Sequence, residues 1–324
     1  MPQHSSTPPP HPSHPPHHPH TRPGLWPLSI APGRLAADIR TGNPAGATVA
    51  ILGIPDDVGV RLNNGRPGAA GGPAAFRAAL ARYGVADPAG WSWPLVYDAG
   101  DVVPAEGTDA AALLETHRRV TDGARALIDA GLLVVGIGGG HDLTLPLVRA
   151  AIDAGAARSE PVSRGVYFDA HLDVRPQVGS GMPFRRLLED HAVTDLRVVG
   201  LDPFANSREH VAWFTAHGGR IIDPAAPEWA GALAPAGACF VSVDMDVFAA
   251  ADAPGVSALN PAGLAPGEVL PAVRALAATG RVRAFDIMEL NPAFDHDGRT
   301  ARLAARVFLE FLRGLAEHGA GARP

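Results

Sequence analysis

The chain contains no lysine, and its basic side chains are all arginine or histidine. The absence of lysine excludes Schiff-base catalysis and phosphate binding by a P-loop, because both need a lysine amine. Cys239 is the only cysteine and lies in an apolar run, so we expect it in the core. One cysteine can form neither a disulfide framework nor a zinc–thiolate site. Since no apolar run reaches about eighteen residues, no segment is expected to span a membrane.

The chain also lacks a basic tract, and its formal net charge is -6. This charge disfavours nucleic acids and anionic membranes as partners. The N-terminus does not show the charged-then-apolar order of a signal peptide. With a hydrophobic fraction of 46%, the composition indicates a globular cytoplasmic protein.

The first 24 residues are rich in proline, histidine and serine. Such a segment buries too little apolar surface to offset its ordering entropy, so we expect residues 1–24 to be a disordered tail. Its histidines could collect metal ions adventitiously, but a disordered segment gives them no fixed geometry. Residues 25–324 are then expected to form a single globular domain.

That part of the chain alternates apolar strand-like segments with helix-like segments. The expected strands are residues 47–54, 132–137, 165–168, 196–199, 239–243 and 284–288. The expected helices are residues 74–82, 112–130, 143–154, 208–217, 266–279 and 300–317. Residues 56–72, rich in glycine, asparagine and arginine, are expected to form a loop. The alternation predicts an α/β fold with a mainly parallel sheet covered on both faces, which binds ligands at the carboxyl ends of its strands.

Chemistry is concentrated where the strand at residues 165–168 ends. Asp169, His171 and Asp173 follow at alternate positions, and in extended backbone such side chains project to the same side. Carboxylates are rarely buried unless they are paired or bind a metal. A solvated acidic loop is the alternative explanation.

Three further strand ends carry similar groups. His141 follows the glycines 138–140, Asp244 and Asp246 follow a second strand, and Glu289 follows a third. Each has an alternative: a dinucleotide-binding turn for the glycines, a hydrogen-bonded core residue for His141, a helix-capping turn for Asp244 and Asp246. Together they form a set of oxygen and imidazole ligands without sulfur, which suits Mn²⁺ or a similar ion. The carboxylates would also balance two divalent ions that share a bridging water.

The motifs G-G-G-H-D at residues 138–142, D-A-H-x-D at 169–173 and S-x-D-x-D at 242–246 resemble the ureohydrolase family of arginase, agmatinase and formimidoylglutamase. The resemblance implies a three-layer αβα sandwich and two Mn²⁺ ions per subunit. It implies that one ion is held by His141, Asp169, Asp173 and Asp244. It implies that the other is held by Asp169, His171, Asp244 and Asp246.

Within that family, the segments 59–69, 180–184, 200–207 and 291–302 resemble the formimidoylglutamase branch. This resemblance implies hydrolysis of the C–N bond of N-formimidoyl-L-glutamate to glutamate and formamide, a step of histidine degradation. The alternatives are a guanidino-compound hydrolase that releases urea and a non-catalytic binding protein on the same fold. The loop after Asp246 differs from the Gly-Leu-Asp-Pro of many relatives, which affects the expected loop shape rather than the ligands.

The resemblance also assigns roles. The expected catalytic residues are Asp173, Glu289 and His171, with Glu289 receiving the amidinium group. The expected substrate-binding residues are Arg175, Glu289, Ser180, Arg66 and Asn64. Arg175 can offer a bidentate fork to one substrate carboxylate, and Arg61 or Arg66 could serve the other. The alternative for Arg175 is a salt bridge to a neighbouring acid.

Phe184 stands where arginases carry a proton-shuttling histidine. We expect its ring to make the pocket apolar beside the formimidoyl carbon, where a guanidinium would place a third nitrogen. Residues Leu303, Val307, Phe311 and Leu315 form an apolar face on the last expected helix. This face is expected to pack on the sheet of its own chain, with an oligomer contact as the alternative.

Overall fold

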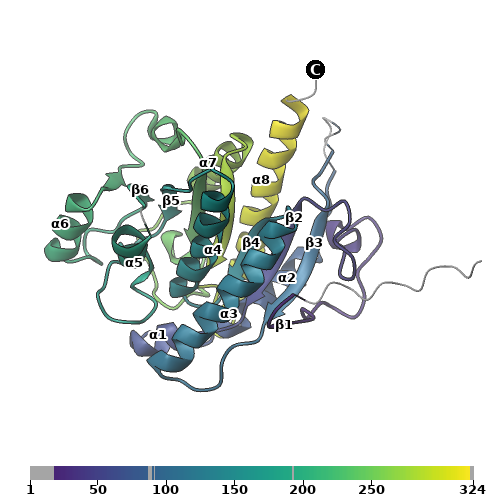
Figure 1. The fold of residues 1–324 in the computed structure, drawn as a ribbon, viewed down its shortest axis with the longest axis horizontal. Helices are drawn as coiled ribbons and strands as arrows, with labels where there is room; N and C mark the ends of the chain where they lie inside the picture. Colours follow the sequence, from purple (N-terminus) through teal and green to yellow (C-terminus); the bar gives the residue numbers. More distant parts are fainter. Residues whose placement is uncertain (1–17, 87–89, 91, 192, 322–324) are drawn as a thin grey trace, which may run out of the picture.

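The computed structural model describes residues 18–86, 90, 92–191 and 193–321 (Figure 1). It contains a nine-stranded sheet in the order β1-β3-β2-β4-β9-β8-β5-β6-β7. The strands are β1 Thr21–Arg22, β2 Val49–Ile54, β3 Val96–Val102, β4 Leu133–Gly138, β5 Arg164–Phe168, β6 Asp195–Val199, β7 Gly219–Ile222, β8 Cys239–Asp244 and β9 Val282–Met288. Only β1 runs antiparallel to its neighbour among the described strands. The expected parallel sheet is confirmed.

Helices cover both faces of this sheet (Figure 1). They are α1 Val58–Leu62, α2 Gly72–Leu80, α3 Ala110–Asp129, α4 Thr144–Ala157, α5 Pro183–Asp190, α6 Arg208–Ala216, α7 Pro266–Ala278 and α8 Arg299–Gly321. Helices α2, α7 and α8 pack in one apolar core, and α3, α4, α5 and α6 in the other. In β2, Val49 and Ile51 belong to the first core while Ala50 and Leu52 belong to the second, because alternate side chains of a strand face opposite ways. The result is the three-layer αβα arrangement.

The apolar face of α8 is used within the chain. Val307 and Phe311 are fully buried, and the Phe311 ring stacks on Phe285 of β9 with centroids 4.0 Å apart. The expectation that this face packs on its own sheet is therefore confirmed. Among the described helices, none has the length and apolar character needed to cross a membrane.

One expectation about local structure was wrong, and three elements were not expected. The segment 56–72 is not all loop, because Val58–Leu62 forms α1. Strand β3 was not expected, and its Asp98 and Asp101 are both buried. The helix α5 and the short strand β7 were also missed.

The start of the ordered chain also differs from the expectation. Residues 18–24 were expected in the disordered tail, but Thr21 and Arg22 pair with β3 and His18 is buried against Tyr97. The rest of the expected tail, residues 1–17, lies outside the described residues.

Candidate active site

Four strands that are adjacent in the sheet end at the same edge and carry the expected residues. The order β4-β9-β8-β5 places their carboxyl ends side by side. His141 follows β4, Glu289 follows β9, Asp244 ends β8 and Asp169 follows β5. Parallel strands bring their carboxyl ends to one edge, so these side chains meet although they lie far apart in the sequence.

The first group is centred on the imidazole of His141. Its Nδ1 atom lies 2.9 Å from Asp173 Oδ2, and 3.1 Å from both Asp169 Oδ2 and Asp244 Oδ2. The side chains of His141, Asp169 and Asp244 are almost fully buried, and that of Asp173 is 14% exposed. Three carboxylate oxygens thus converge on one imidazole nitrogen in a buried place, an arrangement that a shared cation would satisfy. Together these four residues could hold one metal ion.

The second group shares Asp169 with the first. His171 Nδ1 lies 3.1 Å from Asp246 Oδ2 and 3.4 Å from Asp169 Oδ1. Asp169 therefore presents one carboxylate oxygen to each group, as a bridging ligand would. Asp244 Oδ1 accepts a hydrogen bond from the Asp246 amide at 2.8 Å, so this residue caps a turn while its other oxygen faces His141. The capping alternative and metal ligation are compatible in Asp244.

In both groups, burial and close neighbouring charges shift the pKa values of the side chains. Burial and the neighbouring carboxylates raise the pKa of Asp169 and raise that of Asp244 well above the usual range. Burial is the largest single influence on both imidazoles and opposes their protonation. The surrounding carboxylates together outweigh it, with Asp244 contributing most at His141 and Asp246 most at His171, so both pKa values are raised. Four carboxylates and two imidazoles without sulfur form a donor set that fits two divalent ions of the Mn²⁺ type.

A buried chain of polar groups orients His141 from behind. His141 Nε2 lies 3.0 Å from the Ser242 hydroxyl, which donates to Asp286 Oδ1 at 2.5 Å. Ligating histidines commonly use their second nitrogen in this way, and such a bond fixes the ring orientation. Thr144 also lies within reach of Ser242, at 3.3 Å. Burial raises the pKa of Asp286 to about 6. Asp286 was not expected as a site residue, although it stands three residues before Glu289.

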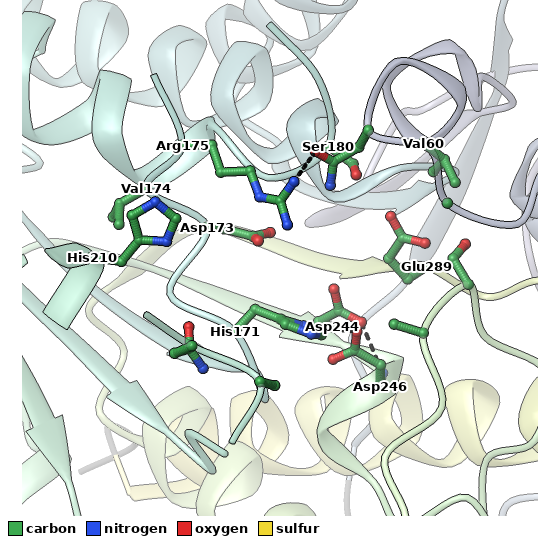
Figure 2. A pocket seen from close by; sticks show the side chains of 16 residues that line it. Val60, His171, Asp173, Val174, Arg175, Ser180, His210, Asp244, Asp246 and Glu289 are labelled. Carbon is green, nitrogen blue, oxygen red and sulfur yellow. Dashed lines mark hydrogen bonds and ion pairs between the residues drawn. The ribbon is translucent and has the colours of Figure 1, made fainter. Parts of the chain in front are cut away.

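A cavity of about 210 Å³ opens above the two groups (Figure 2). Its lining includes His171, Asp173, Asp244, Asp246 and Glu289. Further lining residues are Val60, Asn63, Gly65, Val174, Arg175, Ser180, Ala205, Asn206, His210, Ser257 and Ala258. Four of the six expected metal ligands thus line one small pocket together with the expected substrate contacts Glu289, Arg175 and Ser180.

Asp173 and Glu289 both adopt left-handed backbone, with φ of 48° and 63°. Such geometry is uncommon for residues other than glycine and concentrates at functional sites. Glu289 accepts a hydrogen bond from the His141 amide through Oε1 at 3.0 Å, whereas Oε2 makes no hydrogen bond of normal geometry with the described residues. Burial, with a further contribution from Asp246, raises the pKa of Glu289 to about 8. A buried carboxylate with one free oxygen is suited to receive an amidinium.

Arg175 projects into the cavity near Ser180 (Figure 2). Its Nη1 donates to Asn63 Oδ1 at 2.9 Å, and its backbone amide donates to the Gly181 carbonyl at 2.7 Å. No ion pair joins Arg175 to a carboxylate among the described residues. The alternative in which Arg175 forms a salt bridge is therefore wrong for the described residues. Most N–H donors of the Arg175 guanidinium remain free.

Other residues expected near the substrate do not line the cavity. Asn64 is exposed, and its neighbour Asn63 faces the pocket instead. Arg61 pairs with Asp57 at 3.0 Å. Arg66 donates to the Val256 carbonyl at 2.6 Å and to that of Ser257 at 3.1 Å, and it lies over the Phe294 ring.

Phe184 was expected as an apolar wall of the pocket, and this expectation was wrong. The ring is fully buried, stacks on Tyr167 with centroids 3.7 Å apart, and meets the His141 ring edge-on at 5.1 Å. Its ring supports His141 from the core. It therefore gives no argument about the substrate.

Asn206 was missed as a site residue, although the segment that contains it was singled out. Its Nδ2 donates to the carbonyl of Ala170 at 2.8 Å, and its Oδ1 accepts from the amide of Leu172 at 3.0 Å. These bonds flank His171 on both sides. Asn206 thus fixes the loop that presents a candidate metal ligand.

Below α1 lies a second buried polar cluster. His117 Nε2 lies 2.7 Å from Asp142 Oδ2, and both side chains are buried. Asp142 Oδ1 stands where a side chain at Gly59 would clash, so glycine at this position lets α1 approach the G-G-G-H-D turn. The Gly59 carbonyl accepts from the Ser180 amide at 2.9 Å and from the Asn63 amide at 3.1 Å. This packing fixes the positions of Asn63 and Ser180, which line the cavity.

Comparisons with known proteins agree with this geometry. The family model described as "Arginase family" matches residues 47–313. A formimidoylglutamase of Aromatoleum aromaticum is 36% identical over 302 residues, which cover 85% of each chain. The crystal structure of Trypanosoma cruzi formiminoglutamase with two Mn²⁺ ions superposes with a TM-score of 0.79 at 30% identity, covering 91% of this chain and all of that one. Proclavaminate amidino hydrolase of Streptomyces clavuligerus superposes with a TM-score of 0.74 at 26% identity, covering 90% and 99%.

Proposed function

This chain belongs to the arginase family, and from that premise we propose that it hydrolyses N-formimidoyl-L-glutamate to glutamate and formamide. It is a formimidoylglutamase-like hydrolase with a binuclear metal site. The choice of substrate is supported by the two groups that line the cavity. The cavity holds the free carboxylate oxygen of Glu289 near the metal groups and the free guanidinium donors of Arg175 on another wall.

For the two metal sites we propose Mn²⁺ as the ion, held as the sequence analysis expected. One ion would be bound by His141, Asp169, Asp173 and Asp244. The other would be bound by Asp169, His171, Asp244 and Asp246. When bound, such a pair of ions lowers the pKa of a shared water, which makes hydroxide available near neutral pH.

The chain's own residues orient the amidine for attack. Glu289 Oε2 accepts hydrogen bonds from the formimidoyl NH₂ group and holds the amidine carbon over the metal groups. As the water oxygen bonds to this carbon, Asp173 takes up the released proton. Asp173 then returns the proton to the leaving nitrogen as the C–N bond breaks, which yields formamide and the free amine of glutamate. Catalysis here combines positioning with proton transfer.

Arg175 and Ser180 bind the far end of the substrate. Arg175 donates to one carboxylate, while Asn63 keeps the guanidinium in place. Ser180 lines the same wall and offers a hydroxyl. Agmatine would bring a second cation to Arg175 and be repelled. A glutamate-derived substrate matches the charge of this wall better than an amine does.

The test is a substrate panel on purified, Mn²⁺-loaded protein, with formamide and urea quantified separately. N-formimidoyl-L-glutamate is expected to exceed arginine, agmatine and guanidino acids in kcat/KM. Arg175→Ala is expected to raise KM roughly 10- to 100-fold with little change in kcat, because a remote carboxylate contact exists in ground and transition states alike. Arg61→Ala, a nearby arginine outside the cavity, is the matched control and should behave as wild type.

The second candidate function is the hydrolysis of a guanidino compound with release of urea. The similarity to proclavaminate amidino hydrolase supports it, since the same metals and Glu289 would serve. Dominant urea release from a guanidino substrate would establish this alternative. Lack of any hydrolysis would instead favour a binding protein on the same fold.

A further inference from the structure

His210, in the first turn of α6, lines the cavity beside Val174 (Figure 2). Its position is fixed from two sides. The Ser207 hydroxyl caps the helix by accepting from the His210 amide at 3.1 Å, and Asn206 just before it is bonded to the loop around His171. The start of α6 and the candidate metal-binding loop therefore form one hydrogen-bonded unit.

The His210 imidazole lacks the partners that His117 and His217 have. His117 pairs with Asp142, and His217 stacks on Trp213 with centroids 4.1 Å apart. The His210 ring makes no hydrogen bond or ion pair there, and only its backbone amide is engaged. It is half-buried at the cavity wall, so its N–H is available to a ligand.

Three basic side chains line the cavity: His171, Arg175 and His210. His171 faces Asp246 and Asp169 as a candidate metal ligand, so it is committed to the metal groups. The other two basic residues are Arg175 and His210. Neither lies within ion-pair distance of a carboxylate in the described part of the chain. Their partners must come from the ligand if their donors are to be satisfied in a filled cavity.

We propose that His210 binds the second carboxylate of the substrate, while Arg175 binds the first. This inference rests on the proposed function, because only a diacid gives both residues a partner. It replaces Arg61 and Arg66 in that role, since both are engaged outside the cavity. An imidazole N–H donates to a carboxylate in either protonation state. Recognition of two carboxylates by two walls makes the enzyme specific for glutamate-derived amidines over those with one carboxylate.

The experiment compares wild type with His210→Ala, which removes the donor, and His210→Gln, which keeps an N–H donor on a flexible chain. His217→Asn, a histidine at the exposed end of the same helix, is the control. Three substrates are used: N-formimidoyl-L-glutamate, N-formimidoyl-L-glutamine without the side-chain carboxylate, and N-formimidoyl-4-aminobutanoate without the α-carboxylate. The inhibition constant of L-glutamate, a product with both carboxylates, is measured in parallel.

His210→Ala should lower kcat/KM for the diacid roughly 10- to 100-fold, mainly through KM, as expected for a lost hydrogen bond to a charged group. The substitution should have the same effect on the analogue that keeps the carboxylate bound by His210. It should have almost no effect on the analogue that lacks this carboxylate, so the comparison identifies it. The inhibition constant of L-glutamate should rise in parallel. His210→Gln should recover part of the loss, and His217→Asn should show none.

Equal losses on all three substrates would overturn the inference, because they would mean that His210 acts only through the structure of α6. An unchanged KM for the diacid in His210→Ala would overturn it as well. Both outcomes leave the proposed function intact when wild type releases formamide. Wild-type protein that does not hydrolyse N-formimidoyl-L-glutamate would overturn the proposed function, and this inference with it.

Discussion

The carboxylate of Asp244 contacts the first metal group and the backbone that presents the second through different atoms. Oδ2 faces His141, whereas Oδ1 caps the turn that presents Asp246. One substitution therefore affects the charge balance of the site and the local backbone. The two effects can be separated by choosing the replacement.

We predict that Asp244→Ala abolishes both metal retention and turnover, since a shared ligand is lost from each group. Asp244→Asn keeps an oxygen able to cap the turn but removes the charge, so it should also lose metal while remaining folded. Elemental analysis after dialysis, with activity measured in parallel, provides the test. Asp190→Ala, at the end of α5, is the control. Wild-type metal content in Asp244→Ala would refute the ligand assignment.

The buried carboxyl of Asp286 gives a prediction about pH. Burial raises its pKa from 3.8 to about 6, although the Ser242 hydroxyl donates to it. Because the folded pKa exceeds the unfolded one, the native state binds the proton more tightly, and stability falls as pH rises from about 4 to 6. A difference of about two pKa units corresponds to roughly 3 kcal/mol at neutral pH.

Asp286→Asn removes this titration. In metal-free protein, the free energy of unfolding of the variant relative to wild type is therefore expected to increase between pH 4 and pH 6 and to level off above. Urea unfolding at a series of pH values measures this difference. A constant difference across that range would contradict the raised pKa of Asp286.

At the scale of elements, a buried ion-pair network joins α2 to β3. Arg77 is fully buried and donates to both oxygens of Asp98 at 2.8 Å and to Asp101 at 2.6 Å. Burial acts to lower the pKa of Arg77, but these carboxylates outweigh it and raise the pKa above its usual value. The network explains how a strand with two aspartates can be buried.

Arg77→Met is predicted to lower the free energy of unfolding by about 3–5 kcal/mol, because it leaves two carboxylates buried without a cation. Arg125→Ala removes a largely exposed ion pair with Asp129 on α3. This substitution should change the free energy of unfolding by less than about 1 kcal/mol. Urea unfolding of both variants gives the comparison. Similar small effects from the two substitutions would show that the buried network contributes little.

At the scale of the whole molecule, the chain from His18 to Arg22 is packed against strand β3. His18 Nε2 lies 3.2 Å from the Tyr97 hydroxyl, and Thr21 and Arg22 extend the sheet next to β3. The preceding residues 1–17 have a composition without apolar pattern or site motif. A catalytic unit that begins near residue 18, rather than residue 25, is our proposal.

Removing residues 1–17 is predicted to leave the melting temperature and kcat/KM unchanged. Removing residues 1–24 should lower the free energy of unfolding by on the order of 2 kcal/mol, because strand β1 and its few hydrogen bonds are lost. Calorimetry and activity assays on both truncated chains measure these effects. Loss of activity or solubility in the shorter truncation would reveal a role for the first 17 residues.

Much of the fold could be predicted because its signals are local. The strand Val49–Ile54 is a continuous apolar run, as expected for a strand buried on both faces, and Arg208–Ala216 falls within its expected range. The strand Val96–Val102 could not be predicted, since its two aspartates are satisfied by an arginine distant in sequence. The short helix Val58–Leu62 was missed because it lies in a segment rich in glycine and asparagine.

The sequence by itself indicated the donor set of the site, and the resemblance of its motifs to a known family indicated the class of reaction. Carboxylates and histidines at strand ends identify an oxygen–nitrogen metal site, because ligand chemistry depends on residue type and local spacing. Only the tertiary structure decided which strands lie side by side and which basic residues face the cavity. Asn63 and His210 line it, whereas Asn64 and Arg66 do not, since these orientations follow from helix placement and packing across the sheet edge. The metal site is thus encoded locally, while substrate recognition depends on contacts between segments distant in the chain.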